Sequence, residues 1–139
     1  MQHPVVRREF VRVAFGAAAA LLIPFRTTRA MSAPAPHPTP RPGITAAKVL
    51  RGDQVGNDPK LAAIFDGVRT MPEIVDGIGC QCGCAASEGF YSLLTCYEGE
   101  SAMARGCAIC QGQGALVVRL HRDGKSLDEI RRAIDAKFG

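Results

Sequence analysis

The chain has 139 residues, with 17 lysines and arginines against 13 aspartates and glutamates. Residues 1–30 contain five of the arginines and one of the acids, so residues 31–139 carry 12 bases and 12 acids. The excess positive charge belongs to the N-terminus, and the rest of the chain lacks the basic patch that binds nucleic acid or an anionic membrane surface. We therefore expect neither as a partner.

The first 30 residues have the pattern of an export signal. The run Arg7-Arg8-Glu9-Phe10-Val11-Arg12 precedes an apolar, alanine-rich stretch at residues 13–25. As a helix this stretch spans about 20 Å, short of a bilayer core of about 30 Å, which is typical of a signal peptide. The motif predicts the twin-arginine route, cleavage after Ala30, and a periplasmic or extracellular protein that meets the membrane only through its signal. An ordinary Sec signal or an uncleaved anchor is the alternative.

A proline-rich linker is expected at residues 31–43, where proline occupies every second position from Pro34 to Pro42. Such a segment favours an extended, solvated polyproline conformation, and we expect His37 within it to be solvated as well. The folding unit is then residues 44–139. A domain of this size gains stability from disulfides or from a metal.

Two helices are predicted before the first cysteine. Residues 44–57 contain few large apolar residues and predict a short helical or irregular arm. Asp58 and Pro59 suit the N-cap and the first position of a helix. Its apolar stripe has the helical spacing of three and four, at Leu61, Ile64, Phe65 and Val68. A second, short helix is predicted from Pro72 to Asp76.

Two longer helices are predicted in the C-terminal half, after a loop at residues 85–95 that continues into a turn of helix near residues 91–96. The first begins at Ala102 or Cys107 and ends at His121, and it should bury Ile109, Leu116, Val117 and Leu120. Ser126 and Glu129 form a capping box that opens the second. One face of that helix carries Leu127, Ile130, Ala133, Ile134 and Phe138. Together the elements predict a small all-α domain with long loops around the cysteines.

All six cysteines lie between residues 80 and 110. Cys80, Cys82 and Cys84 alternate with other residues, and in an extended chain residues two apart project to the same side. Gly83 lets the chain bend tightly between the last two, because it has no Cβ. After Cys96, the pair Cys107-x-x-Cys110 falls at a predicted helix N-terminus, where the positive end of the helix dipole favours thiolate.

These residues resemble a known family. The run Cys80-Gln81-Cys82-Gly83-Cys84, Cys96 before Tyr97, the CxxC pair and the final segment around residues 124–135 are similar to the PCYCGC-motif family, which consists of small, exported, often lipid-anchored bacterial proteins. The resemblance covers about residues 70–139, and it implies little about function because the family is mostly uncharacterised. Gly79 and Gln81 replace the proline and tyrosine of the motif. Phe90 and Met103 stand where the family often has histidines. The sequence has no lipobox cysteine near the predicted signal, so we do not expect the lipid anchor that is common in the family.

A thiol cluster of this kind predicts a soft-metal site. Thiolates suit Cu(I) and Zn(II), and a structural zinc takes four of them. We expect a protein of metal storage, delivery or resistance, working with a metal-transport or metalloenzyme-assembly protein. Met103 is a weaker candidate, as a thioether ligand for Cu(I), because such a methionine more often fills a gap in the core. The predicted ligands, not necessarily all at once, are Cys80, Cys82, Cys84, Cys96, Cys107, Cys110 and Met103.

Two other uses of the cysteines stay open. An even number of cysteines in a small exported domain is ordinarily a disulfide framework, which would make the protein a stapled interaction module. Cys107-x-x-Cys110 would also serve as a redox dithiol, although the strand and βαβ pattern that usually surround such a pair are not evident. No set of catalytic residues stands out, so whether the protein is an enzyme stays undecided.

Overall fold

The computed structural model of the chain describes residues 33–139, so the predicted export signal lies outside the described residues. The described part is all-α, as predicted, and contains no strand; its only β pairing is an isolated bridge between Val49 and Glu98. The α-helices are α1 (Pro59–Arg69), α2 (Pro72–Asp76), α3 (Cys84–Glu88), α4 (Ala108–Arg122) and α5 (Leu127–Phe138), and the short 3-10 helices are η1 (Gly52–Gln54), η2 (Leu93–Tyr97) and η3 (Met103–Arg105). Within residues 33–139, no helix is long and apolar enough to span a bilayer.

The two strongest helix starts in the sequence are confirmed. Asp58 Oδ1 accepts hydrogen bonds from the backbone N–H groups of Lys60 and Leu61, at 2.8 and 3.4 Å. At α5, Ser126 Oγ accepts from the Glu129 N–H at 3.3 Å, while the Glu129 carboxylate accepts from the Ser126 N–H at 2.8 Å. Both caps pair backbone donors that a helix N-terminus would otherwise leave without partners.

Replacing Ser126 with Ala is therefore expected to lower the free energy of unfolding by about 1 kcal/mol, because the Glu129 N–H loses its acceptor. Chemical denaturation of the reduced protein measures this. Ser101, an exposed serine in a turn, gives the matched control Ser101→Ala, which should change stability little. Equal losses for the two variants would contradict the role given to the cap.

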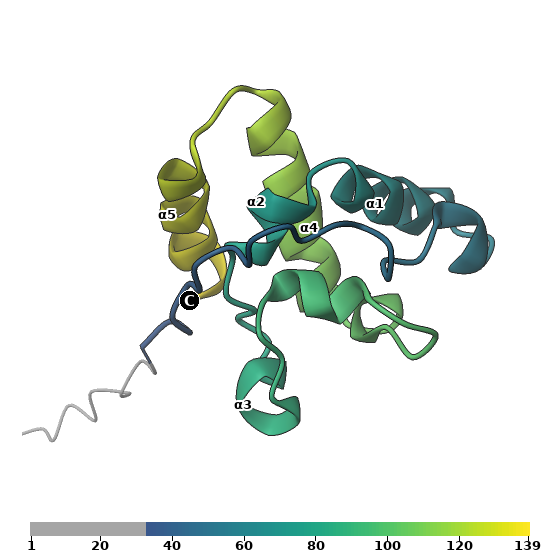
Figure 1. Cartoon of the computed structure of the whole chain (residues 1–139), viewed down its shortest axis with the longest axis horizontal. Coiled ribbons are helices and arrows are strands. Elements are labelled where there is room, and N and C mark those ends of the chain that lie inside the picture. The colour runs from purple at the N-terminus through teal and green to yellow at the C-terminus, as the bar shows by residue number, and fades with distance from the viewer. Residues whose placement is uncertain (1–32) are drawn as a thin grey trace, which may run out of the picture. The chain divides into compact units, whose positions relative to one another are not determined.

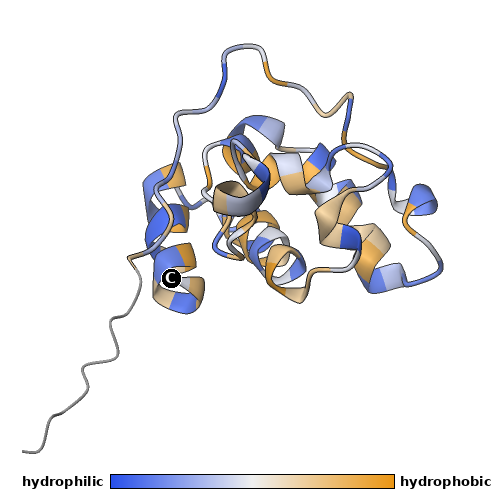
Figure 2. Cartoon of the chain, turned by 90° about the horizontal axis from the view of Figure 1, so that it is seen from below, coloured by the Kyte–Doolittle hydropathy of each residue, from blue (hydrophilic) through white to orange (hydrophobic). Residues whose placement is uncertain are grey.

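Helix α4 is the centre of the domain and contacts α1, α2, α5, η2 and η3. Its buried face carries Cys110, Gln113, Leu116 and Val117, while Phe65 of α1 and Ile130 and Ile134 of α5 complete the core around it. Tyr97 of η2 packs edge-on against Phe65, with ring centroids 4.7 Å apart. Each long helix carries both hydrophilic and hydrophobic residues. Figure 2 shows this for α5, the helix that ends at the mark C.

Two local predictions are wrong. Ile109 is 43% exposed, because the first turn of α4 packs against the domain through Cys110 and turns Ile109 toward solvent. The loop expected from residue 85 is instead α3, which begins at Cys84. This helix follows a glycine in the left-handed region, Gly83 with φ of +86°, and its N-cap makes no side-chain hydrogen bond, so the sequence contains no ordinary capping signal for it. The irregular arm at residues 44–57 is confirmed, with η1 as its only helical turn.

The proline-rich segment is not a solvated spacer. Its described part, residues 33–43, which we call the strap, starts beside the end of α5 and continues past α2 (Figure 1). Arg41 forms an ion pair with the fully buried carboxylate of Asp76 in α2, with 2.7 Å between Nη2 and Oδ1. The expectation of a solvated His37 is also wrong, since its side chain is 13% exposed and is bonded at both ring nitrogens.

Candidate metal centre

The cysteine triplet is placed by the end of α2 and the start of α3. Cys80 follows Ile78 and Gly79 directly after α2 and is fully buried. Gly83 adopts its positive φ between Cys82 and Cys84, a conformation that residues with a side chain rarely adopt, so the predicted tight bend is confirmed. The bend brings the sulfurs of Cys82 and Cys84 to 2.6 Å and leaves those of Cys80 and Cys82 3.0 Å apart.

The fourth sulfur comes from α4. Cys107 is the N-cap of this helix and accepts the Cys110 N–H at Sγ, 3.5 Å away, which sets the first turn with Cys110 facing inward. Cys110 Sγ lies 3.7 Å from Cys80 Sγ and 3.5 Å from Cys82 Sγ. All four sulfurs, of Cys80, Cys82, Cys84 and Cys110, lie within 4.8 Å of one another. We call these four residues the thiol cluster.

The cluster has dimensions that suit a thiolate-bound ion. Four sulfurs at about 2.3 Å from a tetrahedral zinc lie about 3.8 Å from each other. The distances from Cys110 Sγ to the sulfurs of Cys80 and Cys82, 3.7 and 3.5 Å, are close to this value. The two separations inside the triplet are shorter, so an ion of this size requires those side chains to spread by a rotation. The four sulfurs are therefore close enough together to bind a metal ion, and the described residues contain no other group of cysteine, histidine and acidic side chains so arranged.

The three other predicted ligands, Cys96, Cys107 and Met103, lie outside the thiol cluster. Cys96 is fully buried in η2, within the same hydrophobic core as Cys80 and Cys110, but it is not one of the four sulfurs grouped within 4.8 Å. Cys107 is partly exposed at the entrance to α4. Met103 lies partly buried in η3 against the hydrophobic core, and its place as a ligand stays a prediction. All six cysteines are free thiols, so the structure contains no disulfide among residues 33–139.

Because the sulfurs lie so close together, the cysteines of the cluster differ in pKa. Hydrogen bonding to the Cys110 thiol lowers the pKa of Cys80 well below its ordinary value. Burial and the neighbouring Cys80 raise the pKa of Cys82 to about 12, and the same neighbour raises the pKa of Cys110. A bound cation would favour the thiolate form of each sulfur that ligates it, so its binding would release protons from the cluster.

Two polar side chains that were not among the predicted ligands hold this arrangement. Gln113 is fully buried, with Oε1 3.5 Å from Cys80 Sγ and accepting the Gln81 N–H at 3.2 Å. The hydroxyl of Tyr97 donates to the Cys110 carbonyl at 2.6 Å. Gln113 stands three residues after Cys110, on the face that Val117 continues, and a polar residue on an apolar stripe is a signal that would have identified it.

The hydrogen bond from Tyr97 to the Cys110 carbonyl also explains why residue 114 is glycine. A Cβ on Gly114 would lie 2.0 Å from the Tyr97 hydroxyl oxygen, so only glycine lets the tyrosine reach along α4 to the Cys110 carbonyl. Burial raises the pKa of Tyr97, and the neighbouring cysteines raise it further, so its hydroxyl stays a proton donor. Tyr97 thus fixes the backbone that carries the fourth sulfur of the cluster.

Comparison with known proteins agrees with the resemblance seen in the sequence. A family model described as a protein of unknown function with PCYCGC motif matches residues 45–139. The comparison with curated proteins and that with solved structures gave no match. The match starts just after the strap and covers both pieces of chain that make the thiol cluster. The chain belongs to the PCYCGC-motif family.

Proposed function

We propose that this protein binds a soft metal ion, Cu(I) or Zn(II), through cysteine thiolates, and that it serves in metal storage, delivery or resistance. The observation that carries the proposal is the grouping of four sulfurs within 4.8 Å, three from one bend and one from α4. A site made of sulfur alone favours Cu(I) and Zn(II) over Mg(II), Ca(II) or Mn(II), which prefer oxygen ligands.

Cys80, Cys82, Cys84 and Cys110 would hold the first ion, with Gln113 and Tyr97 fixing the backbone around them. Cys107, which contacts the Cys110 N–H, and Cys96, which is buried in the same core, would be the ligands for a second ion that shares Cys110. The metal would supply positive charge that keeps several neighbouring sulfurs deprotonated at once. The chain itself would supply the geometry and the exclusion of water, because Cys80, Cys96 and Cys110 are fully buried.

Elemental analysis and native mass spectrometry of the mature protein, isolated without oxygen, test this function. We expect Cu or Zn bound at one or two ions per chain, with all six cysteines reduced. A metal-free protein with three disulfides, and no uptake of Cu(I) or Zn(II) after reduction, would refute the proposal. That result would support the stapled module, or a redox dithiol at Cys107 and Cys110.

We further propose that the protein is exported by the twin-arginine route and exchanges its metal with a transport or assembly protein outside the cytoplasm. Support comes from the Arg7-Arg8 motif before an apolar run. A twin-arginine substrate folds before it crosses the membrane, in a compartment where thiols stay reduced and can take up metal.

The double change Arg7→Lys and Arg8→Lys is therefore expected to hold the protein in the cytoplasm, because the export motif requires the arginine pair. Immunoblots of cell fractions measure this. The matched change Arg26→Lys with Arg29→Lys, after the apolar run, should leave export intact. Normal export of the first variant would instead indicate the Sec route.

A further inference from the structure

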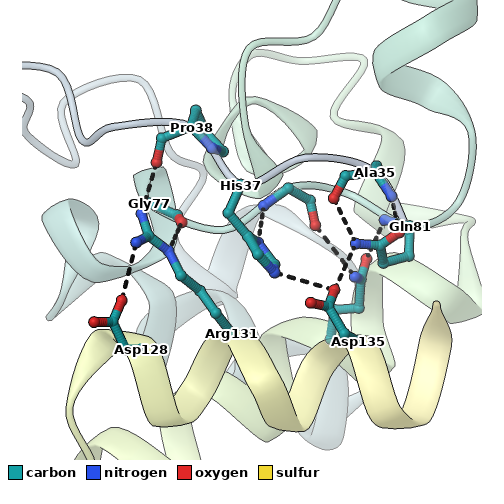
Figure 3. A network of polar contacts seen from close by, with 10 residues as sticks. Ala35, His37, Pro38, Gly77, Gln81, Asp128, Arg131 and Asp135 are labelled. Carbon is teal, nitrogen blue, oxygen red and sulfur yellow. Dashed lines mark hydrogen bonds and ion pairs between the residues drawn. The ribbon is translucent and has the colours of Figure 1, made fainter. Parts of the chain in front are cut away.

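The strap lies directly against the bend that carries Cys80 and Cys82. The Gly79 N–H donates to His37 Nδ1 at 2.9 Å, immediately before Cys80. The Ala35 N–H donates to Gln81 Oε1 at 2.7 Å, and the Gln81 amide donates back to the Ala35 carbonyl at 3.1 Å (Figure 3). Residues more than forty positions apart are thus joined at three points on both sides of a predicted metal ligand.

Helix α5 fastens the strap from the other side. Because His37 Nδ1 accepts a hydrogen bond, its Nε2 carries the proton and donates to Asp135 Oδ1 at 3.1 Å. The same oxygen accepts from the Gln81 amide at 3.3 Å, so Asp135 ties strap and cysteine bend together. One turn earlier, Arg131 donates to the Pro38 carbonyl at 2.8 Å and to the Gly77 carbonyl at 2.9 Å (Figure 3).

This contact depends on a glycine where the family motif has proline. A Cβ on Gly79 would lie 2.4 Å from the Pro36 carbonyl oxygen, so a side chain there would push the strap away. Proline would also remove the N–H that His37 accepts. The departure of this chain from the motif and the docking of its strap are therefore the same structural feature.

A cleft of about 710 Å³ is lined by the first residues of the strap, by the cysteine bend and by α3. Its lining includes Pro34 and Pro36 of the strap, Cys80 and Gln81 of the bend, and Ala85 and Ala86 of α3. Cys80 itself has no exposed surface, and the strap is hydrogen-bonded to the residues on both sides of it, so a reagent in the cleft can reach Cys80 only if the strap or the bend moves.

We propose that the strap gates access to Cys80, a fully buried member of the thiol cluster whose two neighbours it binds, and that His37 is the positioning residue that latches it. The metal half of this inference rests on the proposed function. Its consequence for the thiol does not, because a latched strap shields Cys80 whether or not the cluster carries an ion. Loss of the His37 bonds removes the strap's attachment to the Gly79 N–H and to Asp135, which loosens the strap and the backbone next to Cys80. The bonds at Ala35, Pro38 and Arg41 remain.

The test uses the full chain with His37→Ala, compared with His121→Ala as a matched control at the far end of α4. In reduced, metal-free protein, iodoacetamide labelling of Cys80, followed by peptide mass mapping, should become about tenfold faster in His37→Ala and stay unchanged in the control. His37→Asn, whose amide oxygen can replace Nδ1 as acceptor for Gly79, should restore most of the protection. A structural role unrelated to the latch would not produce this rescue.

A second measurement follows transfer of bound Cu(I) to an excess of a Cu(I) chelator, which should be faster in His37→Ala by a similar factor. Circular dichroism confirms folding. If the alanine variant does not fold, Asp135→Ala, which removes the acceptor of the His37 and Gln81 bonds on the partly exposed side of α5, takes its place. Its Cys80 labelling should likewise become faster, whereas unchanged labelling would overturn the gate. Unchanged Cys80 labelling in folded His37→Ala would overturn the gate and leave the metal function standing. Faster labelling in a protein that takes up no Cu(I) or Zn(II) would keep the strap as a cover of the thiols and refute the metal function.

Discussion

Replacing Cys110 with Ala is expected to weaken binding of Cu(I) or Zn(II) by about a hundredfold or more, since even outer-shell changes at metal sites cost 10- to 100-fold. Cys110 is the only sulfur of the thiol cluster that does not come from the triplet. Without it the remaining three belong to one short bend, and the ion loses its connection to α4. Competition with a chelator of known affinity measures the loss.

Cys107 offers a matched control on the same turn of α4. Cys107→Ser keeps an N-cap side chain and removes a sulfur that lies outside the four-sulfur group. We expect it to weaken binding of the first ion far less than Cys110→Ala does. Equal losses, or a Cys110→Ala variant that binds normally, would show that the four-sulfur grouping is not the site.

Replacing Arg41 with Met is expected to lower the free energy of unfolding at pH 7 by about 2 to 3 kcal/mol, because it leaves the buried Asp76 carboxylate without its cation. The value lies at the low end for a buried pair, since the Arg41 side chain is 38% exposed and water can partly replace it. Ser92 Oγ donates to Asp76 Oδ1 at 2.6 Å, and we expect this bond to remain in the variant. Arg51→Met, which breaks an exposed pair with Asp53, is the control and should cost little.

The Arg41 effect should depend on pH in a known direction. Burial raises the pKa of Asp76, but hydrogen bonds from Arg41 and Ser92 outweigh this and hold the pKa below its ordinary value. The stabilisation is therefore fully present above the unfolded pKa of about 3.9 and is lost as pH falls through the lower folded value. Denaturation of the reduced, metal-free protein at pH 7 and near pH 2 should show the gap between parent and Arg41→Met narrowing in acid. A gap that is constant or wider in acid would contradict the ion pair as its cause.

Local signals in the sequence were enough to predict most of the helices. Asp58 with Pro59 and Ser126 with Glu129 are caps that act within one turn, so α1 and α5 begin where the sequence indicates. Helix α3 was missed because its start depends on the positive φ of Gly83, and Ile109 was misplaced because only tertiary contacts decide which side of a first helical turn is covered.

The sequence was enough to predict a thiol site, but not which cysteines come together in it. The spacing of Cys80, Cys82 and Cys84 predicted crowded sulfurs, and that grouping is confirmed. The sequence could not select Cys110 over Cys107, because the choice depends on how the N-cap sets the first turn of α4. The strap was beyond prediction: His37 contacts Gly79 and Asp135, 42 and 98 positions away, and proline alternation carries no signal for such contacts.

X-ray absorption spectroscopy of the protein loaded with Zn(II) or Cu(I) tests the central claim most directly. The account predicts a first coordination shell of sulfur only, at about 2.3 Å, that loses sulfur in Cys110→Ala. A first shell of nitrogen or oxygen, or a shell that Cys110→Ala leaves unchanged, would contradict it.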